Sequence, residues 1–208
     1  MPTIKRLSIG MLVGLTLLCG CAPSVAVPIP NNELTQEQRS VVEFAEGMFF
    51  LELTVSTPPT EREKAAYLFW ILSTDFYQDK QQEWFDGSVY RIPIAEIEQI
   101  LYTHLDTDSF DPQQSFDPLN GGTKGYDSAS GEYVMPMLGG YGGVRVFGVL
   151  SYKQEGDRIT LTLGSYDVPS YYAENPVYTL LSRYEAELIA LPERGQYKVI
   201  SAKHTPIS

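Results

Sequence analysis

The chain has 208 residues and is acidic, with 26 Asp and Glu against 15 Lys and Arg and a formal net charge of −11. This length suits one folded domain with a core of ordinary size, and the negative charge argues against nucleic-acid binding, because phosphate backbones would repel it. Both cysteines, Cys19 and Cys21, lie near the N-terminus. The rest of the chain therefore has no disulfide, no cysteine metal site and no cysteine nucleophile.

The first 21 residues, MPTIKRLSIGMLVGLTLLCGC, have three parts. Lys5 and Arg6 form a short basic region, residues 7–18 form an apolar core, and a short motif with cysteine follows. The apolar core matches a signal peptide and is too short to cross a bilayer, which needs roughly 20 residues. Its end, Leu18-Cys19-Gly20-Cys21, resembles the lipobox of bacterial lipoproteins.

The resemblance implies that residues 1–20 are removed as a signal peptide and that the thiol of Cys21 carries a diacylglyceryl group. Two acyl chains anchor a protein stably, whereas one binds a membrane only marginally. The chain is then extracytoplasmic and lipid-anchored to a bacterial cell membrane or outer membrane. The alternative is an ordinary cleaved secretory signal with two incidental cysteines. Residues 21–33 are predicted to be a Pro-rich linker, and residues 34–208 a single α+β domain.

The first part of the predicted domain is expected to be helical. A Thr followed three residues later by Gln or Glu is a capping box, which marks a helix start, and such boxes stand at Thr35 and Thr60. Apolar residues at helical spacing then predict helices over about 35–54 and 61–77, joined by a short Pro turn into a helical hairpin. A third helix is predicted from Pro93 to near Asp106.

The remaining segments are predicted to be β-hairpins, over 84–90 about an Asp-Gly turn and over 126–136, followed by strands over 144–152, 158–163, 184–191 and 197–203. In the strand from Arg158 to Leu163, alternate residues are apolar, which indicates an antiparallel strand with one wet face. Helices followed by antiparallel strands predict an α+β fold, with the helices on one face of a curved sheet. In element order this is similar to the cystatin-like and NTF2-like folds.

Metal-binding and phosphate-binding motifs are incomplete, so no metal or cofactor is expected. Asp106-Thr107-Asp108 opens like an EF-hand loop, but Asp111 stands where the motif requires Gly. A different calcium site on Asp106, Asp108 and Asp111 is the alternative to a solvated acidic loop. The Gly-rich run 139–143 lacks the Lys-Ser/Thr of a P-loop and is predicted to be a flexible loop or bulge.

Catalysis by histidine lacks support as well. His104 is predicted at the C-terminal turn of the third helix, where the helix dipole favours its protonated form. His204 is predicted on a frayed strand end. Without a Gly-x-Ser-x-Gly elbow, the sequence gives no serine triad.

Aromatic side chains provide the candidate binding surface. Trp84 and Tyr90 lie in one predicted hairpin, and Tyr166, Tyr171 and Tyr172 crowd one loop. Their flat apolar faces and polar tips suit sugars, peptides or protein partners. The alternative is that the rings pack into the sheet core and only their hydroxyls reach water.

The sequence therefore predicts a non-enzymatic, membrane-anchored lipoprotein that binds a small ligand or an envelope protein. One alternative is an extracytoplasmic hydrolase that uses carboxylate and Tyr side chains without a recognisable motif. It would need a deep pocket holding a carboxylate with a raised pKa. A third hypothesis is a structural or assembly role, which a dimer interface would support.

Overall fold

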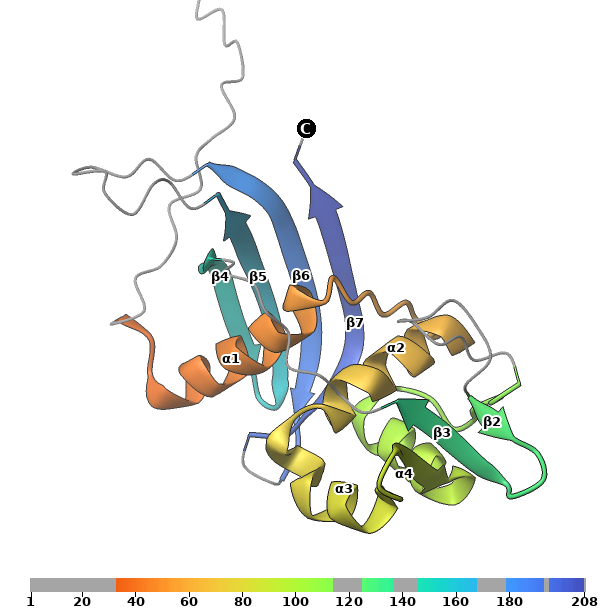
Figure 1. The fold of residues 1–208 in the computed structure, drawn as a ribbon. Helices are drawn as coiled ribbons and strands as arrows, with labels where there is room; N and C mark the ends of the chain where they lie inside the picture. The colour runs from red at the N-terminus through yellow and green to blue at the C-terminus, as the bar shows by residue number, and fades with distance from the viewer. Residues whose placement is uncertain (1–32, 114–124, 137–145, 168–178, 193–194, 208) are drawn as a thin grey trace, which may run out of the picture.

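A computed structural model describes residues 33–113, 125–136, 146–167, 179–192 and 195–207. The fold is α+β, as predicted, with helices packed on a curved antiparallel sheet (Figure 1). The larger sheet has the strand order β4-β5-β6-β7, and a second, smaller sheet has the order β1-β3-β2. The smaller sheet was not predicted as a separate unit.

Helix α1 spans Gln36–Phe50, and Thr35 forms the predicted capping box with Gln38. The helix ends earlier than predicted because Glu52 adopts a positive φ of 54°. The amide of Glu52 donates to Phe49 O at 3.0 Å and that of Leu53 to Met48 O at 3.3 Å, which is the Schellman motif. Glycine normally occupies this position, so the sequence carried no stop signal there.

Helix α2 spans Glu61–Leu72 and begins with the second predicted capping box, formed by Thr60 and Glu63. It was predicted to continue to residue 77, but the hydroxyls of Ser73 and Thr74 donate to the carbonyls of its last turn. Such side-chain bonds compete with the helical pattern. The chain then makes a short 3₁₀ turn, η2 (Asp75–Tyr77), and an unpredicted helix, α3 (Gln78–Trp84).

The segment after α3 contains the predicted Asp-Gly turn but only one of its strands. Gly87 has a φ of 99°, and the amide of Asp86 donates to Val89 O at 3.1 Å. Strand β1 (Val89–Pro93) follows and runs into helix α4 (Ile94–His104). The predicted hairpin at 126–136 is confirmed as β2 (Tyr126–Asp127) and β3 (Glu132–Pro136), and β3 pairs with β1.

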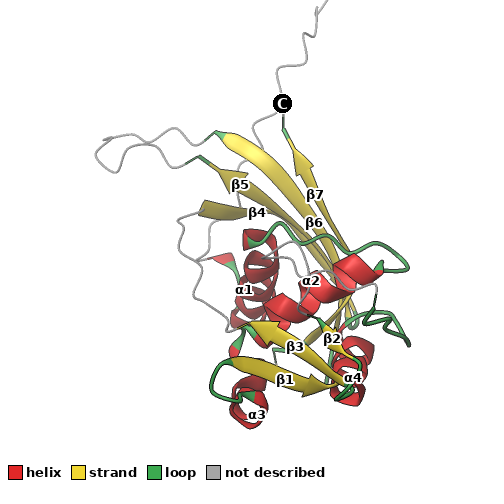
Figure 2. Cartoon of the chain, turned by 45° about the vertical axis from the view of Figure 1, so that its right-hand side comes forward, coloured by secondary structure: helices red, strands yellow, loops and turns green. Residues whose placement is uncertain are grey.

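The four-stranded sheet consists of sequential antiparallel hairpins: β4 (Val146–Glu155), β5 (Arg158–Tyr166), β6 (Leu180–Ala190) and β7 (Tyr197–Pro206). The alternation predicted for β5 is confirmed, since its Ile and Leu residues are buried and Thr160 is exposed. Helices α1 and α2 lie over the same face of this sheet (Figure 2). The opposite face, called here the outer face, carries the polar residues.

Two connecting segments cover the free edge of β7. Val55, between α1 and α2, exchanges both backbone hydrogen bonds with Ala202, at 2.8 and 2.9 Å. Leu105, just after α4, forms a parallel bridge with Val199. Both residues are buried in the core that joins helices and sheets. A covered edge has fewer unpaired backbone groups to offer to another chain.

Several predictions fall outside the described residues: the signal peptide, the lipobox with Cys21, the linker up to residue 32, the Gly-rich run 139–143, and Tyr171 and Tyr172. In the part of the chain that is described, no helix combines the length and the apolar character needed to cross a membrane.

Candidate functional site

Three of the five predicted aromatic binding residues, Trp84, Tyr90 and Tyr166, lie in the described part of the chain. Trp84 ends α3 and is 6% exposed, and Tyr166 ends β5 and is 5% exposed. Tyr166 lies close against Gly164, where a Cβ would be 2.9 Å from its hydroxyl oxygen. Tyr90 is half-buried on β1 and packs against Phe85, with ring centroids 5.3 Å apart. Neither Trp84 nor Tyr166 lines either of the two grooves described below.

A different set of aromatic residues lines an open groove of about 460 Å³ between α1, the end of α2, η2 and the β6–β7 turn. We call it the aromatic groove. Its lining residues are Ser40, Glu43, Phe44, Gly47, Trp70, Thr74, Asp75, Phe76 and Gly195. The groove therefore combines three aromatic rings with two carboxylates.

Phe44 is the centre of the groove floor. Its ring meets the edge of Trp70 at a centroid distance of 4.9 Å, and Tyr197 of β7 at 4.9 Å from behind. Phe76 stands 6.3 Å away and is 39% exposed, whereas Trp70 is 5% exposed. The floor is thus fixed by core packing, and Phe76 provides an exposed wall.

The exposed wall is held by the turn between α2 and α3. Gln81 of α3 donates from its side-chain amide to the carbonyls of Leu72 and Thr74. Those bonds fix the chain just before η2, which presents Asp75 and Phe76 to the groove. The early end of α2 is what brings Phe76 here, because a continuous helix would have carried it on the predicted apolar stripe.

Gly47 allows Trp70 to approach α1 closely. A Cβ at Gly47 would lie 3.1 Å from Nε1 of Trp70, tighter than ordinary side-chain contacts. Among the described residues the indole N–H has no hydrogen-bond partner, although Trp70 is almost wholly buried. Gly47 and Trp70 both line the groove, so this donor lies at its surface. The Nε1 atom is not among the buried side-chain atoms that lack a partner in the described part of the chain, so the N–H reaches the surface of the groove and is accessible to solvent there.

Behind the floor lies a buried network around His104. Its Nδ1 is 3.1 Å from Tyr197 O, and its Nε2 is 3.0 Å from the hydroxyl of Tyr77. A carbonyl only accepts, so Nδ1 carries the proton, Nε2 accepts, and Tyr77 donates. Burial lowers the pKa of His104, although the bond to Tyr197 opposes the shift.

The two histidine predictions therefore need correction. His104 does end α4, but it is fully buried, and the desolvation of its ring outweighs the helix dipole that was expected to favour the protonated form. His204 is not on a frayed end. It lies within β7, pairs with Tyr184 of β6 and stacks on its ring at a centroid distance of 4.4 Å.

A second groove, of about 560 Å³, lies on the outer face of the four-stranded sheet. We call it the sheet groove. It is lined by Thr54, Val55, Ser56, Glu63, Thr160, Thr162, Glu185, Ala186, Glu187, Ser201, Ala202 and Lys203. Hydroxyl and charged groups dominate this lining, and it contains no aromatic residue.

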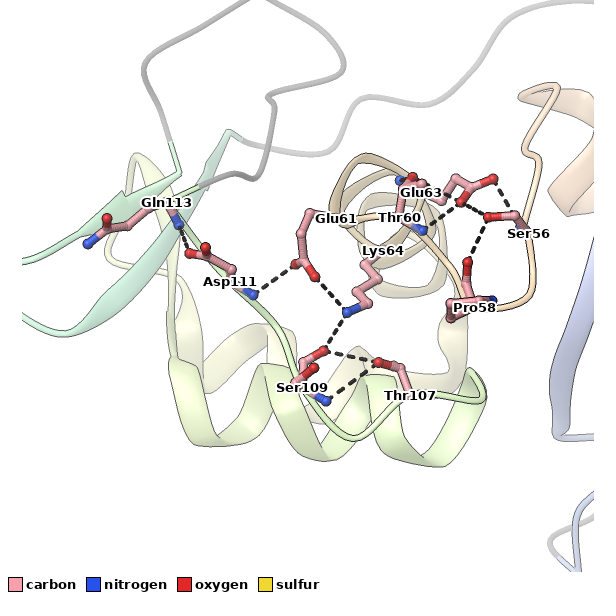
Figure 3. Close-up of polar contacts among 10 residues, drawn as sticks. All are labelled: Ser56, Pro58, Thr60, Glu61, Glu63, Lys64, Thr107, Ser109, Asp111 and Gln113. Atoms are coloured by element: carbon pink, nitrogen blue, oxygen red, sulfur yellow. Dashed lines mark hydrogen bonds and ion pairs between the residues drawn. The ribbon is translucent and has the colours of Figure 1, made fainter.

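Glu63 lines the sheet groove, and Figure 3 shows its contacts with Ser56 and Thr60. Its carboxylate accepts from the amides of Ser56 and Thr60, at 3.0 and 2.7 Å, and from both of their hydroxyls, at 2.6 and 2.9 Å. Burial raises the pKa of Glu63, but these four hydrogen bonds outweigh it, so the pKa lies below its ordinary value. A carboxylate with this many donors is a poor general base.

On the other side of α2, Lys64 is 4% exposed and holds the loop after α4. Its Nζ lies 2.6 Å from Oε1 of Glu61 and donates to Ser109 O at 2.7 Å, while Asp111 donates its amide to Oε2 of Glu61 at 2.8 Å (Figure 3). This pairing satisfies a buried charge. The backbone of the acidic loop after α4 is therefore held against α2 at Ser109 and Asp111.

The alternatives of a calcium site and of a hydrolase concern the carboxylates of the described residues. Among the described residues no cluster of His, Cys, Asp or Glu could hold a metal ion, and Oδ1 of Asp111 accepts from the amide of Gln113 at 3.0 Å. Burial, reinforced by Glu43, raises the pKa of Glu46. Glu46 lines neither groove, so neither offers the pocket carboxylate that the hydrolase alternative requires.

Sequence reasoning missed every residue of the aromatic groove. Phe44 and Trp70 lie off the apolar stripes that predicted α1 and α2, and Phe76 was placed on such a stripe. A large aromatic residue outside the stripe of an amphipathic helix was the available signal, because it needs a second surface to pack against.

Comparison of the chain with protein-family models, with curated proteins and with solved structures finds no match in any of the three. The functional argument therefore depends on the residues and geometry described above.

Proposed function

We propose that the chain is a lipid-anchored extracytoplasmic protein whose α+β domain is a binding module, with the aromatic groove as its ligand site. The observation that carries the proposal is the groove itself: the rings of Phe44 and Trp70 form a packed floor, and Phe76 stands exposed beside it. Ligand sites are typically concave, aromatic-lined and supplied with a few polar groups.

The aromatic groove offers a ligand more apolar contact than the sheet groove does, because the sheet groove has no aromatic residue. An aromatic ring buried by a ligand contributes apolar area, and the floor is already rigid because core residues hold it, so little ordering is needed on binding. The indole N–H of Trp70 lies beside this floor and reports on its occupation by NMR. The occupant would be a small molecule or a side chain of an envelope protein.

The membrane part of the proposal is supported by the lipobox-like end of the N-terminal stretch, Leu18-Cys19-Gly20-Cys21. Its test is the variant Cys21→Ala, expressed in a bacterial host beside the unchanged chain. We expect the unchanged chain in the membrane fraction and the variant in the soluble fraction. Membrane association that survives the substitution would reject anchoring at Cys21.

The binding part is tested by native mass spectrometry and NMR. The mature chain with Cys21→Ser is purified from a bacterial host and examined for bound mass, and a fragment library of small aromatic and aliphatic compounds is then titrated against it. We expect binders to shift the indole N–H signal of Trp70 and leave that of Trp84 in place. A library in which no compound shifts Trp70 would reject the groove as a ligand site.

A further inference from the structure

We propose that the ligand of the aromatic groove is an organic cation: an ammonium or guanidinium group attached to an apolar body. The inference rests on the proposed function, because it names the ligand class of the same groove. Three observations carry it: the unpaired carboxylates at the rim, the charge of the whole helical layer, and the aromatic floor.

Two carboxylates stand at the rim with no counter-ion. Glu43 on α1 and Asp75 on η2 are exposed and line the groove. Neither forms an ion pair among the described residues, and no Lys or Arg of the described part lines the groove. The negative charge of Glu43 is felt by its neighbours, since it contributes to the raised pKa of Glu46 and of Tyr197, after burial in both cases. A cation would neutralise this charge.

The negative charge of the helical layer around the groove also favours a cation. Residues 33–113, which contain all the helices, have 16 Asp and Glu against 5 Lys and Arg, a net charge of −11. The described residues of the four-stranded sheet, 146–167, 179–192 and 195–207, have five of each sign. The negative field is therefore concentrated on the helical side. Such a field attracts cations and repels anions before contact.

The aromatic floor recognises a cation by a second mechanism. Ring faces carry partial negative charge, and a cation within about 6 Å of a ring centroid is attracted. Phe76, which is 39% exposed, is the accessible ring of the groove, while Phe44 and Trp70 are 6% and 5% exposed and form its packed floor. Because these rings also bury hydrocarbon, they favour an ammonium or guanidinium that carries an apolar body over a small hydrated ion.

The sheet groove serves as the internal contrast. Its Glu63 already accepts four hydrogen bonds, and its Glu187 is paired with Arg158. It also contains Lys203. Among the described residues, Glu185 is the one carboxylate of the sheet groove without such a partner, whereas the aromatic groove has two. With Lys203 present and no ring, the sheet groove is expected to bind the same cation more weakly.

The experiment uses three probes of matched shape and different charge: phenethylammonium, 2-phenylethanol and 3-phenylpropanoate. Each is titrated into the mature chain carrying Cys21→Ser, with the indole N–H of Trp70 followed by NMR. We expect the cation to bind about tenfold more tightly than the alcohol, and the anion to bind more weakly than both. Added salt should reduce the difference, because it screens exposed charges.

Variants locate the effect. Glu43→Gln and Asp75→Asn should each weaken the cation about three- to fivefold and leave the alcohol unchanged. Glu98→Gln removes one charge from an exposed position of α4 outside the groove and is the matched control, with little expected change. Gly47→Ala, which places a methyl group beside Nε1 of Trp70, should weaken both probes.

The outcomes separate the two proposals. Preference for the cation that is lost in Glu43→Gln and Asp75→Asn supports the inference. Equal binding of cation and alcohol, or cation binding that is insensitive to both substitutions, overturns the inference and keeps the groove as a ligand site. If no probe and no library compound shifts Trp70, both the inference and the proposed site are rejected.

Discussion

The two grooves differ in how far their polar groups are already used. In the sheet groove, Glu63 is surrounded by donors from Ser56 and Thr60. In the aromatic groove, Glu43 and Asp75 have no ion pair among the described residues, and the indole N–H of Trp70 has no acceptor. The sheet groove is the larger of the two, yet more of its polar groups are already hydrogen-bonded or ion-paired within the protein. Unsatisfied groups around a rigid floor are a better sign of a ligand site than volume is.

The largest expected effect concerns the floor of the aromatic groove. Phe44→Ala should lower the free energy of unfolding by about 3–5 kcal/mol, because it removes a buried ring from a packed cluster. Phe85→Ala is the control, since Phe85 is partly exposed and should cost about 1 kcal/mol or less. Urea unfolding of both variants provides the measurement. Equal losses would mean that Phe44 is not a packed floor residue.

A smaller loss is expected in the sheet groove. Glu63→Gln keeps one acceptor oxygen but loses the charge that holds Ser56 and Thr60, so we expect a loss of about 1–2 kcal/mol in the free energy of unfolding. Gln38→Glu makes the reverse change in the capping box of α1 and should alter stability by less than about 0.5 kcal/mol. If both changes proved neutral, the four hydrogen bonds of Glu63 would contribute nothing measurable.

The two regions should also respond to different pH ranges. Burial lowers the pKa of His104 behind the aromatic groove, so below about pH 6.5 the unfolded chain binds a proton that the folded chain does not. The neutral, buried His104 therefore contributes to the free energy of unfolding above about pH 6.5. This contribution is lost as the pH falls toward the lowered pKa of His104. Glu63, whose hydrogen bonds outweigh burial to lower its pKa, follows the same rule in more acidic solution, below its ordinary value of 4.5.

Urea unfolding between pH 7.5 and 6 tests the histidine effect. The variant His204→Gln isolates His104, since these are the two histidines of the chain. We expect the free energy of unfolding to decrease on acidification over this range in the variant as in the unchanged chain. A flat profile in His204→Gln, or a ring signal of His104 that titrates at the ordinary value by NMR, would contradict the buried neutral histidine.

The smallest effect should have the opposite sign. Tyr67 is fully buried beside Trp70, and its hydroxyl has no hydrogen-bond partner in the part of the chain that the structure describes. Tyr67→Phe should therefore stabilise the protein by up to about 1 kcal/mol, whereas Tyr77→Phe, which removes the donor to His104, should cost about 1 kcal/mol. Thermal and urea unfolding of this pair measure the contrast. A destabilising Tyr67→Phe would imply a bound partner for its hydroxyl.

The sequence predicted what local chemistry specifies. The capping boxes at Thr35 and Thr60 specify where α1 and α2 begin, and the alternation of apolar and polar residues in β5 specifies which of its side chains are buried. Helix ends were harder: Glu52 adopts a positive φ without being glycine, and α2 ends where Ser73, Thr74 and Gln81 satisfy its carbonyls. These contacts are local, but they are side-chain hydrogen bonds and a left-handed residue that is not glycine, and the spacing of apolar residues reports neither.

The aromatic groove could not be predicted from local sequence patterns, because it depends on how different elements contact one another. Phe76 belongs to the groove only because α2 stops early, and Trp70 opens its N–H to the groove only because Gly47 on another helix lets it approach. The sequence predicted aromatic side chains as binding candidates, whereas the residues of the proposed groove depend on how α1, α2 and η2 meet.

The covered edge of β7 has a consequence for the order of folding. Val55 pairs with Ala202, the hydroxyl of Thr57 bonds Ile200 O across 143 positions of sequence, and His104 bonds Tyr197 O across 93. The helical half is thus completed by β7, the most C-terminal of the described strands. Contacts of such long sequence separation form late and slow a folding reaction. The helices therefore cannot reach their final packing until β7 has formed and paired with Val55.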